Sequence, residues 1–459
     1  MQSGMKTLVG SVAAVRASRR RFVAGTAVAA AGLPWPAPGR SGEPAKGASM
    51  NESRLERGLT RVKGFEDAEM DFQLIRQLGS TRYGGASIGE CLALARRIEN
   101  GVPESWVTAF TDAAVRQEAD ARARAARGHA VSARDRFLVA SNSFRAAEYY
   151  SSVADPRHAR LGLKSRQCFL AAMQLQDHGF EAVSLPFGEH ELPAYYMRPA
   201  GAPERRGKTL MIVSGYDGTL EETYLAYGRP ALERGYNLLL FAGPGQMDTL
   251  RFHPGQPFLP EYERIGAIAT AHVLSRPYTD PRRLALMGIS FGGYFATRIA
   301  AHEPRIRALV PNSPIVDLHA YMTSFIGFDP ARMPDAEDFR VAEIDRLPAE
   351  LMTAQQRDMA RNLILRLGCD SFKQAYLRLR DFRVGERDLA RIACPVLALA
   401  GRGEGEEPLR QLERFCQGVS GPTTRHLFSS EEGADGHCQS GNLAYSAAVS
   451  LDWLDEILD

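Results

Sequence analysis

The first long stretch of the chain carries the hydrophobic spacing of helices. From residue 51 to residue 180, apolar side chains recur every three or four positions, which is the period of one helix face. The clearest stripe runs through Phe137, Ala140, Phe144 and Ala147. The segments with this pattern are 91–98, 106–126, 131–150 and 158–175. We expect a helical domain over residues 51–180 whose apolar stripes pack against the rest of the chain.

The pattern changes at Phe180, where short apolar runs separated by Gly, Pro and Asn replace the helical spacing. The strand-like runs are 181–185, 191–198, 209–214, 236–242, 284–287, 306–311, 394–400 and 424–429. Helical patterns lie between many of them, at 221–234 and 261–274 for example, and a last one covers 442–458. This alternation predicts an α/β fold with an eight-stranded, mostly parallel sheet covered on both faces. The first two strands are close enough in sequence to form an antiparallel hairpin at its edge.

A long connection lies between the sixth and seventh of these strands. Residues 317–392 are again helical in pattern, and a connection of this length inside a compact domain is usually a functional insertion. We expect a helical lid over a site at the sheet edge, and extra helical padding is the alternative. The α/β domain is then divided into residues 181–316 and 393–459.

The first fifty residues lack the hydrophobic periodicity of a folded domain. Ser18-Arg-Arg-Arg-Phe-Val23 is similar to a twin-arginine export signal, and a weakly apolar run continues to Leu33. That run is too short to span a bilayer. Residues 34–50 are rich in Pro, Gly, Ala and Ser and are typical of a linker. We expect export to the periplasm or the medium without stable membrane insertion; a basic tail, or a true start at Met50, is the alternative.

Charge and cysteine usage exclude several classes of partner. The formal net charge is +2 and no basic stripe carries interleaved aromatic residues, so nucleic acid is not an expected partner. The six cysteines are scattered without a C-x-x-C pair, which argues against a zinc cluster or a redox dithiol. Disulfide bonds are neither predicted nor excluded, because spacing alone cannot pair these cysteines. The sequence is compatible with a monomer and with a homodimer.

One strand ends in a motif that carries chemistry. The apolar run 284–287 leads into Gly288-Ile-Ser-Phe-Gly292, and a small-residue helix pattern follows. This is the G-x-S-x-G motif in its setting of strand, sharp turn and helix, which lifts a serine hydroxyl above the sheet edge. The glycines are needed because a Cβ would crowd the turn. Ser290 is therefore the expected nucleophile.

A second match to the same motif lacks that setting. Gly85-Ala-Ser-Ile-Gly89 follows a segment with helical spacing, 72–78, and then polar Ser80-Thr-Arg82. Because no strand leads into Ser87, we interpret this match as a chance occurrence in a loop.

A serine nucleophile needs a histidine base and an acid, and in this kind of fold both follow the serine in the chain. Of the ten histidines, His437 is the one in a polar, glycine-rich loop after the last strand. The acid is expected just past the seventh strand, where Glu404, Glu406 and Glu407 stand without an aspartate. Glu404 is our first choice, and Asp317, after the sixth strand, is the minority alternative.

The oxyanion of an acyl-transfer intermediate needs two backbone N–H donors. One is expected from Phe291, directly after the nucleophile. The other is expected from Tyr216, in the loop Ser214-Gly-Tyr-Asp-Gly-Thr-Leu-Glu-Glu222 after the third strand. Gly243-Pro-Gly-Gln246, after the fourth strand, is another tight turn that faces the same edge. It lacks both the dinucleotide fingerprint and a Walker lysine, so no nucleotide is expected.

Together these residues resemble one branch of the α/β-hydrolases, which includes 2,6-dihydroxypseudooxynicotine hydrolase, the fungal polyketide-shortening hydrolases of pigment synthesis and the FrsA-like esterases. The resemblance covers about residues 55–459, and its motifs are 214–222, 231–237, 241–246, 288–293 and 436–439. It implies an α/β-hydrolase fold, hydrolysis of a carbon–carbon bond next to a ketone, and neither a metal nor an organic cofactor. It also implies an assisting glutamate soon after the third strand, which would be Glu221, our first choice, or Glu222.

Two features depart from that branch: a glutamate stands where an aspartate is usual for the acid, and the lid is longer. We expect a serine hydrolase that cleaves a carbon–carbon bond next to a ketone, in an acyl-aromatic or β-diketone small molecule of polyketide type, or a related ester. An exported carboxylesterase and a prolyl-oligopeptidase-like peptidase are the alternatives, although the helical first part lacks the repeats of a β-propeller. A non-catalytic binding protein is a further alternative, disfavoured because Ser290 and His437 occur in the right order.

Overall fold

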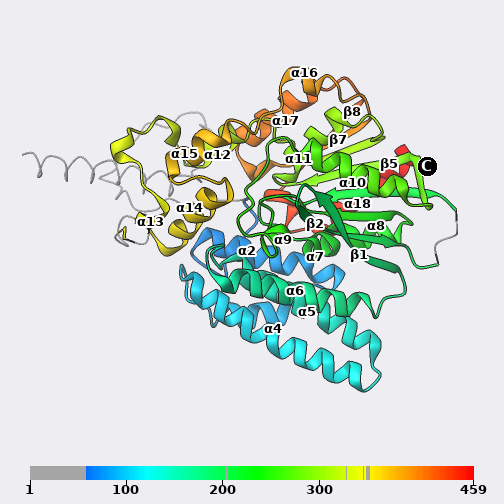
Figure 1. Ribbon diagram of the computed structural model, residues 1–459. Coiled ribbons are helices and arrows are strands. Elements are labelled where there is room, and N and C mark those ends of the chain that lie inside the picture. Colours follow the sequence, from blue (N-terminus) through cyan, green and yellow to red (C-terminus); the bar gives the residue numbers. More distant parts are fainter. Residues whose placement is uncertain (1–57, 202–204, 327, 345, 348–351) are drawn as a thin grey trace, which may run out of the picture.

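The computed structural model describes residues 58–201, 205–326, 328–344, 346–347 and 352–459 (Figure 1). The predicted export signal and the linker lie outside these residues. None of the helices in the described ranges is long and apolar enough to cross a membrane. All six cysteines are free thiols.

The first described part of the chain is helical, as predicted. It consists of α2 (Ala68–Gly79), α3 (Ile88–Ala95), α4 (Pro103–Ala126), α5 (Ala130–Tyr149) and α6 (Pro156–Met173). Two of these helices begin at an aspartate cap: the side chain of Asp67 accepts from the N–H of Met70, and that of Asp155 accepts from the N–H of Arg157. The buried stripe Phe137, Phe144 and Ala147 lies on α5 and joins the core shared with the sheet.

The remainder forms an eight-stranded sheet in the order β1-β2-β4-β3-β5-β6-β7-β8. Its strands are β1 (Gly179–Phe187), β2 (His190–Arg198), β3 (Gly207–Val213), β4 (Asn237–Phe241), β5 (Thr279–Ile289), β6 (Ala308–Asn312), β7 (Val396–Gly401) and β8 (Thr423–Phe428). The pairings from β4 to β8 are parallel, whereas β2 is antiparallel to both β1 and β4. The expected edge hairpin and mostly parallel sheet are therefore confirmed.

Alternate residues of each central strand enter two different cores. On β3, Met211 and Val213 pack on the face covered by α10 (Glu263–Ser275) and α11 (Gly292–His302), whereas Leu210 and Ile212 pack on the other face. That second face is covered by α8 (Arg229–Glu233), α18 (Leu443–Leu458) and the amino-terminal helices. Burial on both faces explains why these strands are continuous apolar runs.

The predicted helix over 221–234 is interrupted. It consists of α7 (Leu220–Thr223), a π-helical segment (Tyr224–Gly228) and α8. Pro230 lies just past the π-helical segment and supplies no backbone N–H to an i→i−4 ladder. Further along, α9 (Met247–Leu250) follows β4, and α17 (Glu406–Gly418) follows β7.

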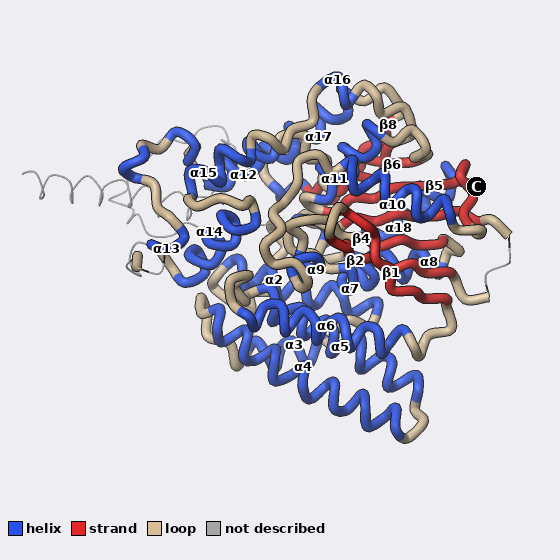
Figure 2. Tube along the Cα trace, in the orientation of Figure 1, coloured by secondary structure: helices blue, strands red, loops and turns tan. Residues whose placement is uncertain are grey.

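The insertion between β6 and β7 is helical, as expected. It contains α12 (Leu318–Ile326), α13 (Val341–Ile344), α14 (Ala354–Arg366), α15 (Phe372–Leu379) and α16 (Glu386–Leu389). In Figures 1 and 2, α12 to α15 form a lobe at the end of the sheet opposite the carboxyl terminus, while the amino-terminal helices lie below. Apolar side chains of the insertion, such as Ile364 and Phe382, join the core on the α10 and α11 face.

The amino-terminal helices and the α/β domain meet around a buried ion cluster. Arg251, directly after α9, pairs with Glu148 of α5 at 2.7 Å and with Glu221 and Asp248 at 3.0 Å each. All four side chains are at most 3% exposed. One guanidinium among three carboxylates holds elements from both domains at a single point.

Candidate active site

The turn after β5 has the strained geometry that its sequence predicts. Ser290 has a φ of 60°, in the left-handed region, and its N–H donates to the carbonyl oxygen of Asn312 at 2.5 Å. A Cβ on Gly288 would lie 2.0 Å from the carbonyl oxygen of Gly292, and a Cβ on Gly292 would lie 2.4 Å from that of Val213. Glycine is therefore required on both sides of the serine.

A chain of hydrogen bonds links three of the predicted residues. The hydroxyl of Ser290 lies 2.8 Å from Nε2 of His437, and Nδ1 of the same ring lies 2.7 Å from Oε2 of Glu404. These residues are separated by 147 and 33 positions in the chain, and they come from the loops after β5, β7 and β8. The loops meet because the carboxyl ends of parallel strands share one edge of the sheet.

Glu404 is held rigidly by groups other than the histidine. It is 6% exposed and lies on a short 3-10 turn, Arg402–Glu404. The N–H of Gly401 donates to its Oε1 at 2.8 Å, and the hydroxyl of Ser313 lies 3.0 and 3.1 Å from its two oxygens. These donors fix the direction of the carboxylate toward the ring.

The other candidate acids have different partners. The side chain of Glu406 is 85% exposed, and both Glu406 and Glu407 pair with Arg410 on α17. Asp317 caps the start of α12 through the N–H of Ala320, and it lies 3.8 Å from Arg383. The geometry therefore selects Glu404 among the four carboxylates considered from the sequence.

The surroundings of His437 raise its pKa. Burial of the ring works against the charged form, but the adjacent sulfur of Cys438 and the carboxylate of Glu404 both favour it. The net result is a pKa above the usual range of histidine. The ring therefore becomes neutral, and able to accept the proton of Ser290, only as the pH rises through this raised pKa.

The loop after β3, residues 214–219, packs directly against the Ser290 turn. A Cβ on Gly215 would lie 2.7 Å from the Cβ of Ser290 and 2.9 Å from the nitrogen of Phe291. Within the described part of the chain, neither the N–H of Tyr216 nor that of Phe291 has a protein acceptor. The two predicted oxyanion donors thus lie on adjoining turns beside the hydroxyl. We call residues 214–219 the β3 loop.

The two candidate glutamates after the β3 loop have different surroundings. Glu221 accepts from the hydroxyl of Tyr195 at 2.6 Å and belongs to the buried ion cluster. Glu222 instead receives two hydrogen bonds from Arg76 of α2, at 2.5 Å each, and a Cβ on Gly218 would lie 3.7 Å from its Oε2. Glu222 also lies 3.6 Å from Arg145, so both glutamates are held by ion pairs with arginines. The choice of Glu221 over Glu222 as the assisting carboxylate stays a prediction.

The second G-x-S-x-G match lies in the helical domain. Ser87 is the residue before α3, and its carbonyl oxygen accepts from the N–H of Cys91 as part of the first helical turn. It has the φ of an extended residue, −123°, in contrast to the left-handed φ of Ser290. No strand precedes it within the described residues.

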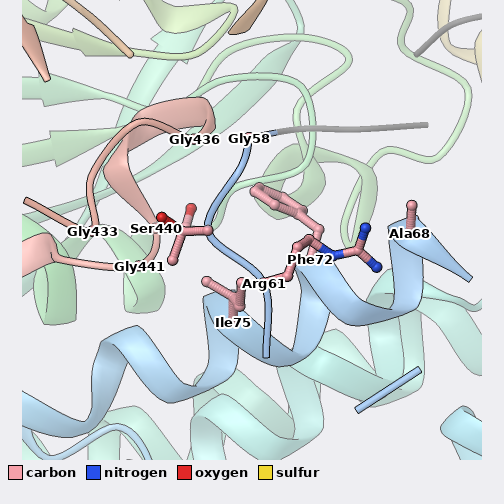
Figure 3. A pocket seen from close by; sticks show the side chains of 10 residues that line it. Gly58, Arg61, Ala68, Phe72, Ile75, Gly433, Gly436, Ser440 and Gly441 are labelled. Carbon is pink, nitrogen blue, oxygen red and sulfur yellow. The ribbon is translucent and has the colours of Figure 1, made fainter. Parts of the chain in front are cut away.

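The loop that carries His437 is anchored by the first described residues of the chain. Figure 3 shows residues 58–61, here called the strap, beside α2 and the histidine loop, residues 433–441, around a small cavity. The buried carboxylate of Asp435 accepts from the N–H of Leu59 at 2.5 Å and from the hydroxyl of Thr60 at 2.6 Å. The carbonyl oxygen of Asp435 also accepts from the N–H of Gly403, next to Glu404.

Sequence reasoning missed several residues that support the site. Ser313, Asp435 and Arg366 gave no local signal, because each acts through contacts far away in the chain. Gln246 did carry a signal, since it ends the Gly-Pro-Gly-Gln turn that was predicted to face the same sheet edge.

Comparison with known proteins places this architecture in a family. The chain is 30% identical over 420 residues to "Hydrolase LUC6" of Fusarium sp, covering 85% of this chain and 97% of that protein. It is 31% identical over 356 residues to "Alpha/beta hydrolase xenA" of Xenoacremonium sinensis, covering 73% and 82%. A profile of the prolyl oligopeptidase family matches residues 267–343.

The solved structures agree on the fold. The crystal structure of 2,6-dihydroxy-pseudo-oxynicotine hydrolase superposes with a TM-score of 0.64, at 18% identity, over 83% of this chain and 95% of that one. The structure titled "AbyA5 Wildtype" superposes with a TM-score of 0.59 at 16% identity. By its fold and its relatives, the chain belongs to the α/β-hydrolases and is a hydrolase of that family.

Proposed function

We propose that the chain is a serine hydrolase that cleaves a carbon–carbon bond next to a ketone, or a related ester, with Ser290, His437 and Glu404 as its catalytic triad. The observation that carries the proposal is the continuous hydrogen-bonded chain of 2.8 and 2.7 Å that ends on a strained serine beside two unpaired N–H groups. That combination of nucleophile, base, orienting acid and oxyanion donors is what acyl transfer requires.

The proposed reaction proceeds through a covalent intermediate on Ser290. Ser290 Oγ attacks the substrate carbonyl while His437 takes its proton, and the N–H groups of Tyr216 and Phe291 stabilise the oxyanion. Collapse breaks the bond to the leaving carbon or oxygen, and His437 returns the proton to that atom. Water, activated by the same histidine, then releases the acyl group as a carboxylic acid and restores the serine. Glu404 keeps Nδ1 protonated throughout.

A carbon leaving group needs an electron sink, such as a second ketone or a dihydroxyaryl ring. Aromatic side chains pack against one another next to the nucleophile turn. The ring of Phe291 lies 5.2 Å from that of Phe258 and 5.5 Å from that of Phe382, which comes from the lid, and Tyr216 stacks on Phe258 at 5.4 Å. Phe258, Phe291 and Phe382 are buried, whereas Tyr216, on the β3 loop, is partly exposed. A partly exposed aromatic ring beside the nucleophile turn supports an acyl-aromatic or β-diketone substrate. The resemblance to 2,6-dihydroxypseudooxynicotine hydrolase supports the same substrate class.

The test compares kcat/KM for an aryl β-diketone and for the aryl ester of the same acid. Ser290→Ala is the blank. Ser87→Ala is the matched control, because Ser87 lies in the same sequence motif but not in a strand–turn–helix. We expect turnover of the diketone that Ser290→Ala abolishes and Ser87→Ala leaves intact. Turnover of the ester alone would show that the protein is a carboxylesterase. Full activity of Ser290→Ala would refute the proposed mechanism.

A peptidase is the second candidate, because the prolyl oligopeptidase profile matches residues 267–343 around the nucleophile. That match covers the turn that carries Ser290. It does not cover the amino-terminal part of this chain, which is helical. A proline-containing peptide anilide in the same assay separates the two functions.

A further inference from the structure

Gln246 has an unusual position behind the β3 loop. It follows the Gly-Pro-Gly turn after β4 and is completely buried. Its amide nitrogen donates to the carbonyl oxygens of Ser214, at 2.7 Å, and Gly215, at 3.2 Å. Its amide oxygen accepts from the N–H of Gly243, at 2.7 Å, and from the hydroxyl of Tyr262. With donors on one side and acceptors on the other, the amide has a single satisfactory orientation.

This contact determines the direction of one peptide bond. The C=O and N–H of a trans peptide point in opposite directions, so a Gly215 carbonyl that faces Gln246 turns the N–H of Tyr216 the other way. The other side of Gly215 is the nucleophile turn, because a Cβ built there would lie 2.7 Å from the Cβ of Ser290. If the peptide reversed, a carbonyl oxygen would take the place of the N–H beside the reacting atom.

The next carbonyl of the β3 loop is held by the lid. Arg366, the last residue of α14, is 3% exposed and donates to the carbonyl oxygen of Tyr216. It also donates to the carbonyl oxygen of Gly245, from Nη2 at 2.7 Å and from Nε at 3.0 Å. Its guanidinium lies 3.8 Å from the ring centre of Tyr216 and 4.8 Å from that of Phe258. A side chain of the lid therefore ties the β3 loop to the β4 turn.

We propose that Gln246 and Arg366 are positioning residues for the oxyanion hole. Gln246 orients the Gly215–Tyr216 peptide so that its N–H faces the oxyanion. Arg366, a residue of the lid, holds the β3 loop in place, so the orientation of this peptide depends on the position of the lid. The inference rests on the proposed function, because it needs Ser290 to form a tetrahedral intermediate. Loss of Gln246 removes the donors of two buried carbonyls and frees the peptide to reverse. The effect is then equivalent to the loss of one oxyanion donor, about 10²–10³-fold in kcat.

The experiment uses Gln246→Met and Gln246→Glu, which keep the length of the side chain but not the two N–H donors. Tyr262→Phe is the matched control, since it removes the partner of the same glutamine on the side away from the β3 loop. Arg366→Met and Arg366→Lys test the lid contact. Each variant is assayed with a p-nitrophenyl ester for kcat and KM, and with a trifluoromethyl ketone of the same acyl chain, whose adduct on Ser290 carries an oxyanion. Active-site titration corrects every rate for the fraction of folded enzyme.

We expect both Gln246 variants to lose about 10²–10³-fold in kcat per active site with little change in KM. The affinity for the trifluoromethyl ketone should fall by the same factor, whereas Tyr262→Phe stays within a few-fold of the unmodified protein. Arg366→Met should also lower kcat. Arg366→Lys, which keeps the positive charge, should have a kcat between that of Arg366→Met and that of the unmodified protein. Unchanged ketone affinity in the Gln246 variants, or a loss confined to the number of active sites, would overturn the inference while leaving the proposed function intact. Absence of Ser290-dependent turnover and adduct in the unmodified protein would overturn both.

Discussion

The sharpest test of the active-site geometry is the substitution Glu404→Gln. The N–H of Gly401 donates to Oε1 of this residue, and Nδ1 of His437 meets Oε2. A glutamine that keeps its oxygen toward Gly401 must turn its NH₂ group toward Nδ1. Two donors cannot face each other at 2.7 Å, so the imidazole moves its proton to Nε2. Nε2 then donates to the hydroxyl of Ser290 and cannot accept its proton.

The size of the effect follows from this wrong tautomer. In serine proteases the equivalent change costs about 10⁴-fold in kcat, which corresponds to about 5 kcal/mol of transition-state stabilisation. The pH profile supplies a second signature. The base acts only when it is neutral, so kcat/KM rises as the pH passes through the pKa of His437. Because Glu404 contributes to the raised pKa of that ring, Glu404→Gln should shift the midpoint to lower pH while the plateau falls.

The assay is the pH dependence of kcat/KM on a p-nitrophenyl ester, together with the rate of fluorophosphonate labelling of Ser290. Glu406→Gln and Glu407→Gln are the matched controls, and both should stay within a few-fold of the unmodified protein. Glu404→Asp withdraws the carboxylate by about 1.5 Å, the length of one C–C bond, and should give an intermediate loss. If Glu404→Gln kept more than a tenth of the activity, or if Glu407→Gln lost it instead, the assignment of the acid would be wrong.

Two further predictions concern contacts between distant parts of the chain. Arg251→Met leaves the three carboxylates of the buried ion cluster without their cation, so we expect a loss of about 3–5 kcal/mol in the free energy of unfolding by urea, with Arg410→Met, at an exposed pair, as the neutral control. A loss below 1 kcal/mol would show that the carboxylates become protonated or solvated. Thr60→Val removes one of the two donors that the strap gives to Asp435 and should cost about 1.5–3 kcal/mol. Hydrogen exchange should then increase in the loop around His437 before it increases in the sheet; a uniform increase would argue against a local role for the strap.

Much of the architecture could be predicted from local patterns. The change of period at Phe180 separates the helical domain from the sheet, and the length of the connection after β6 marks the helical insertion. Ser290 could be recognised because its strand, turn and helix are consecutive in the chain. His437 followed from chain order, since the last loop of this fold ends at the same sheet edge as the nucleophile. These features depend on short segments or on topology, and both can be read from the order of residues.

The rest depended on which surfaces meet in three dimensions. Three glutamates after β7 are equivalent in sequence, but one of them lies on the turn that faces His437 and the other two on the helix that follows. Glu221 and Glu222 are adjacent in the chain, yet their side chains point to different partners, one in the buried ion cluster and one at Arg76. The donors that orient the site, Ser313, Gln246 and Arg366, reach it from separate elements. A hydrogen bond requires its two atoms to meet within about 3 Å, and across distant segments only the folded chain determines that.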